Sequence, residues 1–165
     1  LVMASKPGTT IKTTPAIAKL DGAVLGAGEW IEVATTESFL LQASEPVQVT
    51  QFIVSQGQTQ QFIGAPTMII HPSINRLRND YFVLTPIGYK ENWASVTRPK
   101  GLALQVDGKP ITASFVAIGS GAWEVAYVKL QPGQHRFEAD SAFSLSLYGY
   151  GSATAYGYPG GIVLQ

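Results

Sequence analysis

Apolar and polar residues alternate along most of this chain with the period of two that a half-buried β-strand requires. The alternating stretches are 30–34, 47–52, 101–106, 111–118, 123–128 and 143–148, and 17–20 has the same character. No window carries a sustained apolar stripe at the 3.6-residue period of a helix, although 73–80 is long enough for one short helical turn. The pattern therefore predicts an all-β protein.

Turn residues divide these stretches at short intervals. Asp107-Gly108 separates 101–106 from 111–118, and this dipeptide is a strong signal for a tight β-hairpin. Asp21-Gly22 follows 17–20 in the same manner, and further glycine or proline turns stand at 7–8, 26–28, 132–133 and 159–161. Many short strands joined by such turns are typical of a β-sandwich or jelly-roll-like architecture.

Two local similarities indicate an internal duplication. Residues 41–52 align with 137–148 at an offset of 96, and 26–30 align with 119–123 at an offset of 93. The similar offsets predict two related β repeats, 1–63 and 64–165, that pack as one compact unit. The Gln-rich stretch 56–61 near their junction is expected to be an exposed loop.

The duplication also predicts where the large aromatic side chains lie. Trp30 and Trp123 both follow a Gly-x-Gly turn, so they are expected to begin equivalent strands and to be largely buried. Tyr148 and Tyr150 are expected to face the same side of their strand. That side is expected to be the interior, matching Phe52 in the first repeat.

Composition narrows the class of protein. Only 13% of the 165 residues are charged and the net charge is zero, so nucleic acid is not expected as a main partner. No apolar run is long enough to span a bilayer, which argues against membrane insertion. The neutral surface is typical of extracellular proteins, and the start at Leu1 without a methionine indicates a piece of a longer or processed protein. Cysteine is absent, which removes disulfides and thiolate chemistry.

A search for catalytic and metal-binding patterns gives no positive result. His71 and His135 lie far apart in the sequence, without further ligand-type residues at metal-binding spacing. We therefore expect no enzyme, no cofactor and no metal, and a structural hydrogen-bonding role for His135. A hydrolase with an unrecognised acidic pair stays open as a minor alternative. If distant loops held calcium, the first candidates would be Asp80, Asp107 and Asp140.

The segment 148–161 is unusual because four tyrosines alternate with glycines. Tyrosines with flexible neighbours are favoured in binding loops, since they offer a large contact area at low entropic cost. The alternative is a strand and turn whose tyrosines pack inward. We expect Tyr156 and Tyr158, with Trp93 as a further candidate, to contact a ligand or a neighbouring subunit.

Several motifs along almost the whole chain resemble one known family. They are Gly64-Ala65-Pro66-Thr67-Met68, Arg78-Asn79-Asp80-Tyr81-Phe82, Gly133-Gln134-His135 and Tyr156-Gly157-Tyr158-Pro159-Gly160-Gly161. These are similar to the amino-terminal domain family of the IgG Fc-binding protein. The chain departs from the family at Ala65, where Asp is common, and at Ala155, where Ser is common.

The resemblance implies an adhesive or binding module, and the absence of cysteine favours a bacterial cell-surface version. The expected function is therefore a non-enzymatic extracellular module of a larger surface or fibre protein that recognises a glycan or protein through loops. The alternative is a purely structural or oligomerising fibre domain without a ligand of its own, which would form a homo-oligomer such as a trimer.

Overall fold

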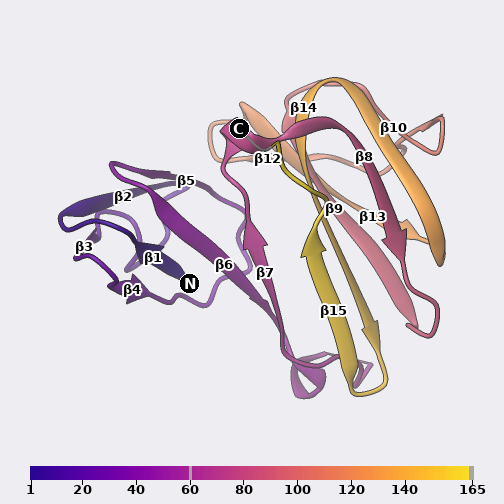
Figure 1. Cartoon of the computed structure of the whole chain (residues 1–165), viewed down its shortest axis with the longest axis horizontal. Helices are drawn as coiled ribbons and strands as arrows, with labels where there is room; N and C mark the ends of the chain where they lie inside the picture. The colour runs from indigo at the N-terminus through magenta and orange to yellow at the C-terminus, as the bar shows by residue number, and fades with distance from the viewer. Residues whose placement is uncertain (60, 164–165) are drawn as a thin grey trace.

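The computed structural model describes residues 1–59 and 61–163. These residues form fifteen β-strands and two three-residue 3-10 helices, with no α-helix among them. The strands make three antiparallel sheets, one of which is curled into a half-barrel (Figure 1). The all-β prediction is confirmed, and the expected helical turn after Pro72 is the helix η2 (Ile74–Arg76).

The first lobe contains seven strands in two sheets. The strands are β1 (Val2–Ala4), β2 (Thr9–Thr14), β3 (Val24–Leu25), β4 (Trp30–Ile31), β5 (Leu40–Ala43), β6 (Val47–Ile53) and β7 (Thr67–His71). One sheet has the order β4-β1-β6-β7 and the other β3-β2-β5. Between them lies a small core of buried side chains: Val2, Ala4, Ile11, Ile17, Leu20 and Leu25.

The second lobe is an eight-stranded sheet with a larger core. Its strands are β8 (Arg78–Thr85), β9 (Glu91–Pro99), β10 (Leu104–Val106), β11 (Lys109–Pro110), β12 (Val116–Ile118), β13 (Trp123–Leu130), β14 (Gly133–Gly151) and β15 (Thr154–Pro159). The order is β11-β10-β14-β9-β13-β12, with β8 and β15 also paired to β14. The core includes Tyr81, Val96, Phe137, Phe143, Leu145 and Leu147.

The bend of β14 curls the second lobe. Its first part pairs with β8 and β10, and its second part pairs with β9 and β15. The register with β8 shifts between Glu138 and Phe143, where the extra residues of a bulge turn the strand. Phe137 and Phe143 lie on either side of this bulge and are both fully buried.

The local strand predictions are confirmed in part. Asp107 and Gly108 both have positive φ and join β10 to β11, as the hairpin signal requires. The predicted return strand 111–118 is wrong as one element, because only Lys109–Pro110 pairs with β10 and Val116–Ile118 pairs with β13. The prediction for 17–20 is also wrong: the segment is a turn, although it still buries two apolar side chains in the first core.

The expected burial of the aromatic side chains is wrong at several positions. Trp30 and Trp123 begin β4 and β13 as predicted, but Trp30 is 59% exposed and Trp123 is only half-buried. Phe52 is exposed as well. On β14, Leu145 and Leu147 face the core, so Tyr148 and Tyr150 point to the opposite face. Alternation identified the faces correctly but not which of them is buried.

The two lobes contact one another where glycines leave room. An added Cβ on Gly157 would lie 2.6 Å from the Ile69 side chain, so β15 accepts the side chains of β7 at this point. An added Cβ on Gly64 would lie 2.8 Å from the ring of Tyr150, and the Gly64 amide donates to Gly151. In Figure 1, β7 runs between β6 and β15.

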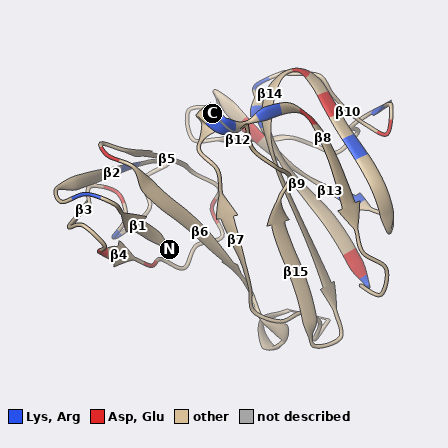
Figure 2. Cartoon of the chain, viewed as in Figure 1, with Lys and Arg blue, Asp and Glu red and all other residues tan. Residues whose placement is uncertain are grey.

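Charge is unevenly distributed over the two lobes. Residues 46–75 and 141–165 contain no Lys, Arg, Asp or Glu. Figure 2 shows the consequence: β6, β7 and β15 carry no charged residue, whereas β8 and the bend of β14 carry several. At that bend Arg136 bonds Asp80 through two nitrogens, each 3.1 Å from a carboxylate oxygen.

Candidate functional site

Four aromatic side chains lie on one face of the strands β13, β9 and β14. Trp93 on β9 stands directly opposite Tyr148 on β14 and Lys129 on β13, and opposed residues share a face. Tyr150 and Tyr127 lie two positions from these partners and so share the same face. We call Tyr127, Trp93, Tyr148 and Tyr150 the aromatic strip.

A charged pair holds Trp93 in place. The Trp93 indole N–H donates to Oε2 of Glu91 at 3.2 Å, and Nζ of Lys129 lies 3.3 Å from Oε1 of the same carboxylate. The Lys129 ammonium also lies 5.4 Å from the centre of the Trp93 ring, within reach of a cation–π interaction. The hydrogen bond from Trp93, followed by Lys129, lowers the pKa of Glu91, so this carboxylate stays ionised at neutral pH.

The two ends of the aromatic strip differ in their surroundings. Tyr148 and Tyr150 meet edge to face with ring centres 5.9 Å apart, and burial raises the pKa of both phenols, so they stay neutral. This end adjoins the first lobe at Gly64. Tyr127, at the other end, is 52% exposed and lines a hollow of about 270 Å³. The hollow is completed by residues 36–38 of the first lobe and by β12.

The structure places Tyr156 and Tyr158 away from the aromatic strip. Both rings pack against the core of the second lobe. The Tyr156 hydroxyl donates to Oδ1 of the buried Asn92 at 2.7 Å. The Tyr158 hydroxyl donates to the Leu84 carbonyl at 2.5 Å and accepts from the Leu84 amide at 3.2 Å, which caps the outer edge of β8. These contacts match the inward-packing alternative, and a ligand contact by either residue stays a prediction.

Removing these two hydroxyls is expected to have unequal effects. Tyr156→Phe leaves the buried Asn92 oxygen without its donor, and we expect a loss of about 1–3 kcal/mol in the free energy of unfolding. Tyr158→Phe affects a more exposed backbone site, and we expect a loss of at most about 1 kcal/mol. Urea unfolding of both variants measures the difference. Equal losses would contradict the expectation that the hydrogen bond to the buried Asn92 contributes more stability than the bonds to the Leu84 backbone.

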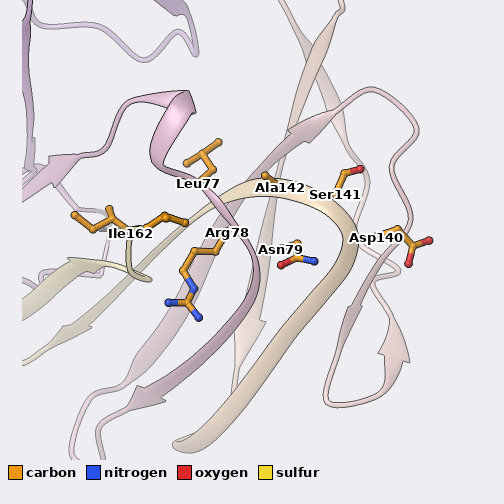
Figure 3. A pocket seen from close by; sticks show the side chains of 8 residues that line it. Leu77, Arg78, Asn79, Asp140, Ser141, Ala142 and Ile162 are labelled. Carbon is orange, nitrogen blue, oxygen red and sulfur yellow. The ribbon is translucent and has the colours of Figure 1, made fainter. Parts of the chain in front are cut away.

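A second hollow on the surface is an open cleft of about 610 Å³ at the bend of β14 (Figure 3). It is lined by the start of β8, the bulge and the segment after β15, with Arg78, Asn79, Asp140 and Ser141 as its polar side chains. In Figure 3 the Arg78 and Asp140 side chains point away from one another. The volume suits a small ligand, but the polar groups do not converge on one point as they do in specific sites.

Of the titratable residues considered in the sequence, Asp80, Asp107 and His135 have hydrogen-bonded partners. Asp107 bonds His135 Nδ1 at 2.8 Å, and His135 Nε2 lies 2.8 Å from the Gln131 carbonyl, so the hydrogen-bonding role expected for His135 is confirmed. Asp80 pairs with Arg136, while Asp140 lines the cleft. Within residues 1–59 and 61–163, no three His, Asp or Glu side chains gather closely enough to hold a metal ion.

The arrangement suits surface recognition better than catalysis. Trp93 was a candidate from the sequence, and the strands bring Tyr127, Tyr148 and Lys129 to its face. The sequence did not predict this grouping, because it depends on the register between β9, β13 and β14. None of the helical elements that the structure describes is long and apolar enough to cross a membrane.

Comparison with known proteins gives one result. A family model described as "IgGFc binding protein" matches residues 1–149, which is most of the chain. Searches among curated proteins and among solved structures return no significant match.

Proposed function

Because the chain belongs to the IgGFc-binding protein family, a family of binding rather than catalytic proteins, we propose that it is a binding module of an extracellular or cell-surface protein. Its partner is a protein or a glycan on another cell or matrix. The family name supports a protein partner, and the neutral surface rich in Ser, Thr and Gln supports an extracellular setting. A bacterial envelope is the specific setting that we propose.

The observation that carries this proposal is the aromatic strip beside the hollow. Aromatic rings that are fixed in place and partly exposed are the usual anchors of binding surfaces. Trp93 is oriented by Glu91, and Tyr127 is open to solvent. The neighbouring Ser95 lies on the same face, is half-buried, and offers a hydroxyl to a polar partner. We therefore propose Trp93, which was already a candidate from the sequence, and Tyr127 as the main contact residues, in place of Tyr156 and Tyr158.

The proposal is tested with two probes, immobilised IgG Fc and a glycan array. We expect the wild-type chain to bind at least one of them and the double variant Trp93→Ala/Tyr127→Ala to lose at least about 2 kcal/mol of binding free energy. Biolayer interferometry gives the affinities. Thermal melting checks that the variant is folded.

The matched control is Phe82→Ala/Leu84→Ala, which removes two exposed apolar side chains on the outer face of β8. Binding by this control is expected to equal that of the wild type. If both probes stay blank with the wild type, or if the two double variants lose affinity equally, the binding surface proposed here is wrong.

The alternative function is a purely structural or oligomerising domain in a fibre, for instance a trimer. A specific observation favours it: the outer face of the sheet β4-β1-β6-β7 carries exposed apolar side chains. A blank result with both probes, together with concentration-dependent association, would support this alternative.

We further propose that the two lobes arose by duplication. The pairing scheme supports this: β1 pairs with β4 and β6, and β9 pairs with β13 and the second part of β14. β2 pairs with β3 and β5, and β10 pairs with β11 and the first part of β14. β6 pairs with β7 as β14 pairs with β15.

The register of one strand pair supports the same proposal. Ile11 stands opposite Ala43 in the first lobe, and Leu104 stands opposite Ala139 in the second lobe. Leu104 follows Ile11 by 93 residues and Ala139 follows Ala43 by 96, which are the two offsets found in the sequence. The residue pairs between β1 and β6 do not map onto the pairs between β9 and β14 through these two offsets. Since β7 pairs with β6, we place the boundary between repeats after His71 instead of after residue 63. An experimental structure in which Ile11 and Leu104 fail to superpose would contradict the duplication.

A further inference from the structure

One face of the sheet β4-β1-β6-β7 carries several exposed apolar side chains, which lie around the polar Gln48 and the buried Thr50. Met3 stands opposite both Trp30 and Gln48, Thr50 stands opposite Ile70, and Phe52 stands opposite Met68. Opposed residues and alternate residues of β6 share a face, so Trp30, Phe52, Met68 and Ile70 all lie on it. We call these four side chains the bare face. The other face of the sheet buries Val2, Ala4, Ile53 and Ile69.

The composition of the bare face matches the centre of a protein interface. Trp30, Phe52, Met68 and Ile70 are between 45% and 59% exposed. The strands that carry them contain no Lys, Arg, Asp or Glu. Interface centres are enriched in aromatic residues and Met and depleted of charge. Exposed apolar side chains that are scattered singly need no explanation, but four on one sheet face do.

We propose that the bare face binds the bare face of a second copy of this chain. A face without charge offers no complementarity to a strongly acidic or basic partner, and it creates no repulsion against itself. The four half-exposed side chains present roughly 400 Å² of apolar area. A standard interface buries about 800 Å² on each partner, so these side chains supply about half, and Met3, Gln48 and the flanking backbone extend the contact.

The contact between the lobes supports a partner that is itself a β lobe of this kind. On β14 and β15, Tyr148 stands opposite Gly157, as Phe52 stands opposite Met68 on β6 and β7. Gly157 is covered within the chain by Ile69 and Ile53. Gly157 in the second lobe corresponds to Met68 in the first lobe, and Gly157 already packs against a β lobe. The Met68 side chain is instead 51% exposed. A two-fold pairing of bare faces would close both copies without forming an open filament.

Sedimentation velocity between about 1 and 500 µM tests the proposal. We expect the wild type to form a concentration-dependent dimer. The variant Phe52→Lys/Met68→Lys, which places like charges across the two-fold contact, is expected to associate at least tenfold more weakly. The control Phe82→Lys/Leu84→Lys adds the same charge to the second lobe and should dimerise like the wild type.

A second measurement does not depend on removing apolar side chains. The chain has no cysteine, so Gln48→Cys introduces a single site for a nitroxide label at the bare face. Pulsed electron spin resonance should give one short label-to-label distance for Gln48→Cys and a much longer one for Gln134→Cys on the second lobe. A wild type that stays monomeric to 500 µM, equal weakening by both lysine pairs, or a trimer without a short distance at position 48 would overturn the proposal.

These outcomes are separate from those of the ligand test. The bare face lies on the first lobe and the aromatic strip on the second, so dimerisation can fail while Trp93 still binds a probe, and the reverse. A monomeric chain would leave the bare face to a different protein partner.

Discussion

Truncating Phe143 to alanine is expected to lower the free energy of unfolding by about 3–5 kcal/mol. The side chain is fully buried, and its ring meets Tyr81 edge to face with ring centres 5.0 Å apart. It also stands directly after the bulge, where the Phe143 carbonyl accepts the Tyr81 hydroxyl at 2.6 Å. The truncation removes packing at the point where β14 turns from one part of the sheet to the other.

Urea unfolding of the purified variant measures this loss. The matched control is Phe82→Ala, which removes the same ring from an exposed position on the adjacent strand β8. The control is expected to change the unfolding free energy by no more than about 0.5 kcal/mol. If the two truncations cost the same, the second lobe does not have its core at the bend of β14.

Adding one methyl group at Gly149 is expected to destabilise the chain by about 2–3 kcal/mol. The new Cβ would lie 2.3 Å from the Tyr156 ring, 2.7 Å from the Glu91 carbonyl oxygen and 2.9 Å from Oδ1 of Asn92. The carbonyl belongs to the neighbouring strand, so it cannot move aside without disturbing the pairing of β14 with β9. The substitution Gly149→Ala also disturbs the hydrogen bond between Tyr156 and Asn92.

Gly57→Ala is the control for this prediction. Gly57 lies in the exposed helix η1 (Gln56–Gln58), and no atom lies within 4 Å of an added Cβ. Its melting temperature should stay equal to that of the wild type or rise slightly, because alanine restricts the unfolded chain. A Gly149→Ala variant that melts with the Gly57→Ala control would show that β14 and β9 are farther apart than described here.

The sequence predicted the fold class because alternation and turn residues are local signals. The hairpin at Asp107-Gly108 is an example, since the two residues themselves adopt the required backbone. The exposure of Trp30 and Phe52 was not predictable from such local signals. Alternation separates the two faces of a strand, but the packing of the whole sheet decides which face is covered. On β6 the side that carries Phe52 also carries Gln48 and Thr50, so the bare face, which depends on residues of other strands as well, cannot be identified from this strand alone.

The candidate site shows the same limit. Trp93 was a candidate contact from the sequence, but its neighbours Tyr127 and Tyr148 come from strands far away in the sequence. Tyr156 and Tyr158 were expected to be exposed because they follow the turn after Gly151. Instead β15 returns along β14, and the Tyr158 hydroxyl meets Leu84 on β8. No local sequence pattern predicts this contact between β15 and β8.

The length of β14 has a consequence for how the protein opens. One continuous strand of 19 residues bonds to β8, β9, β10 and β15, so none of these pairings can separate without disturbing the others. The corresponding strands of the first lobe, β5 and β6, are separate elements in separate sheets. In amide hydrogen exchange, the second lobe should therefore exchange as one cooperative unit with slow kinetics. The amides of β2 and β5 should exchange earlier, through a local opening that leaves β14 protected.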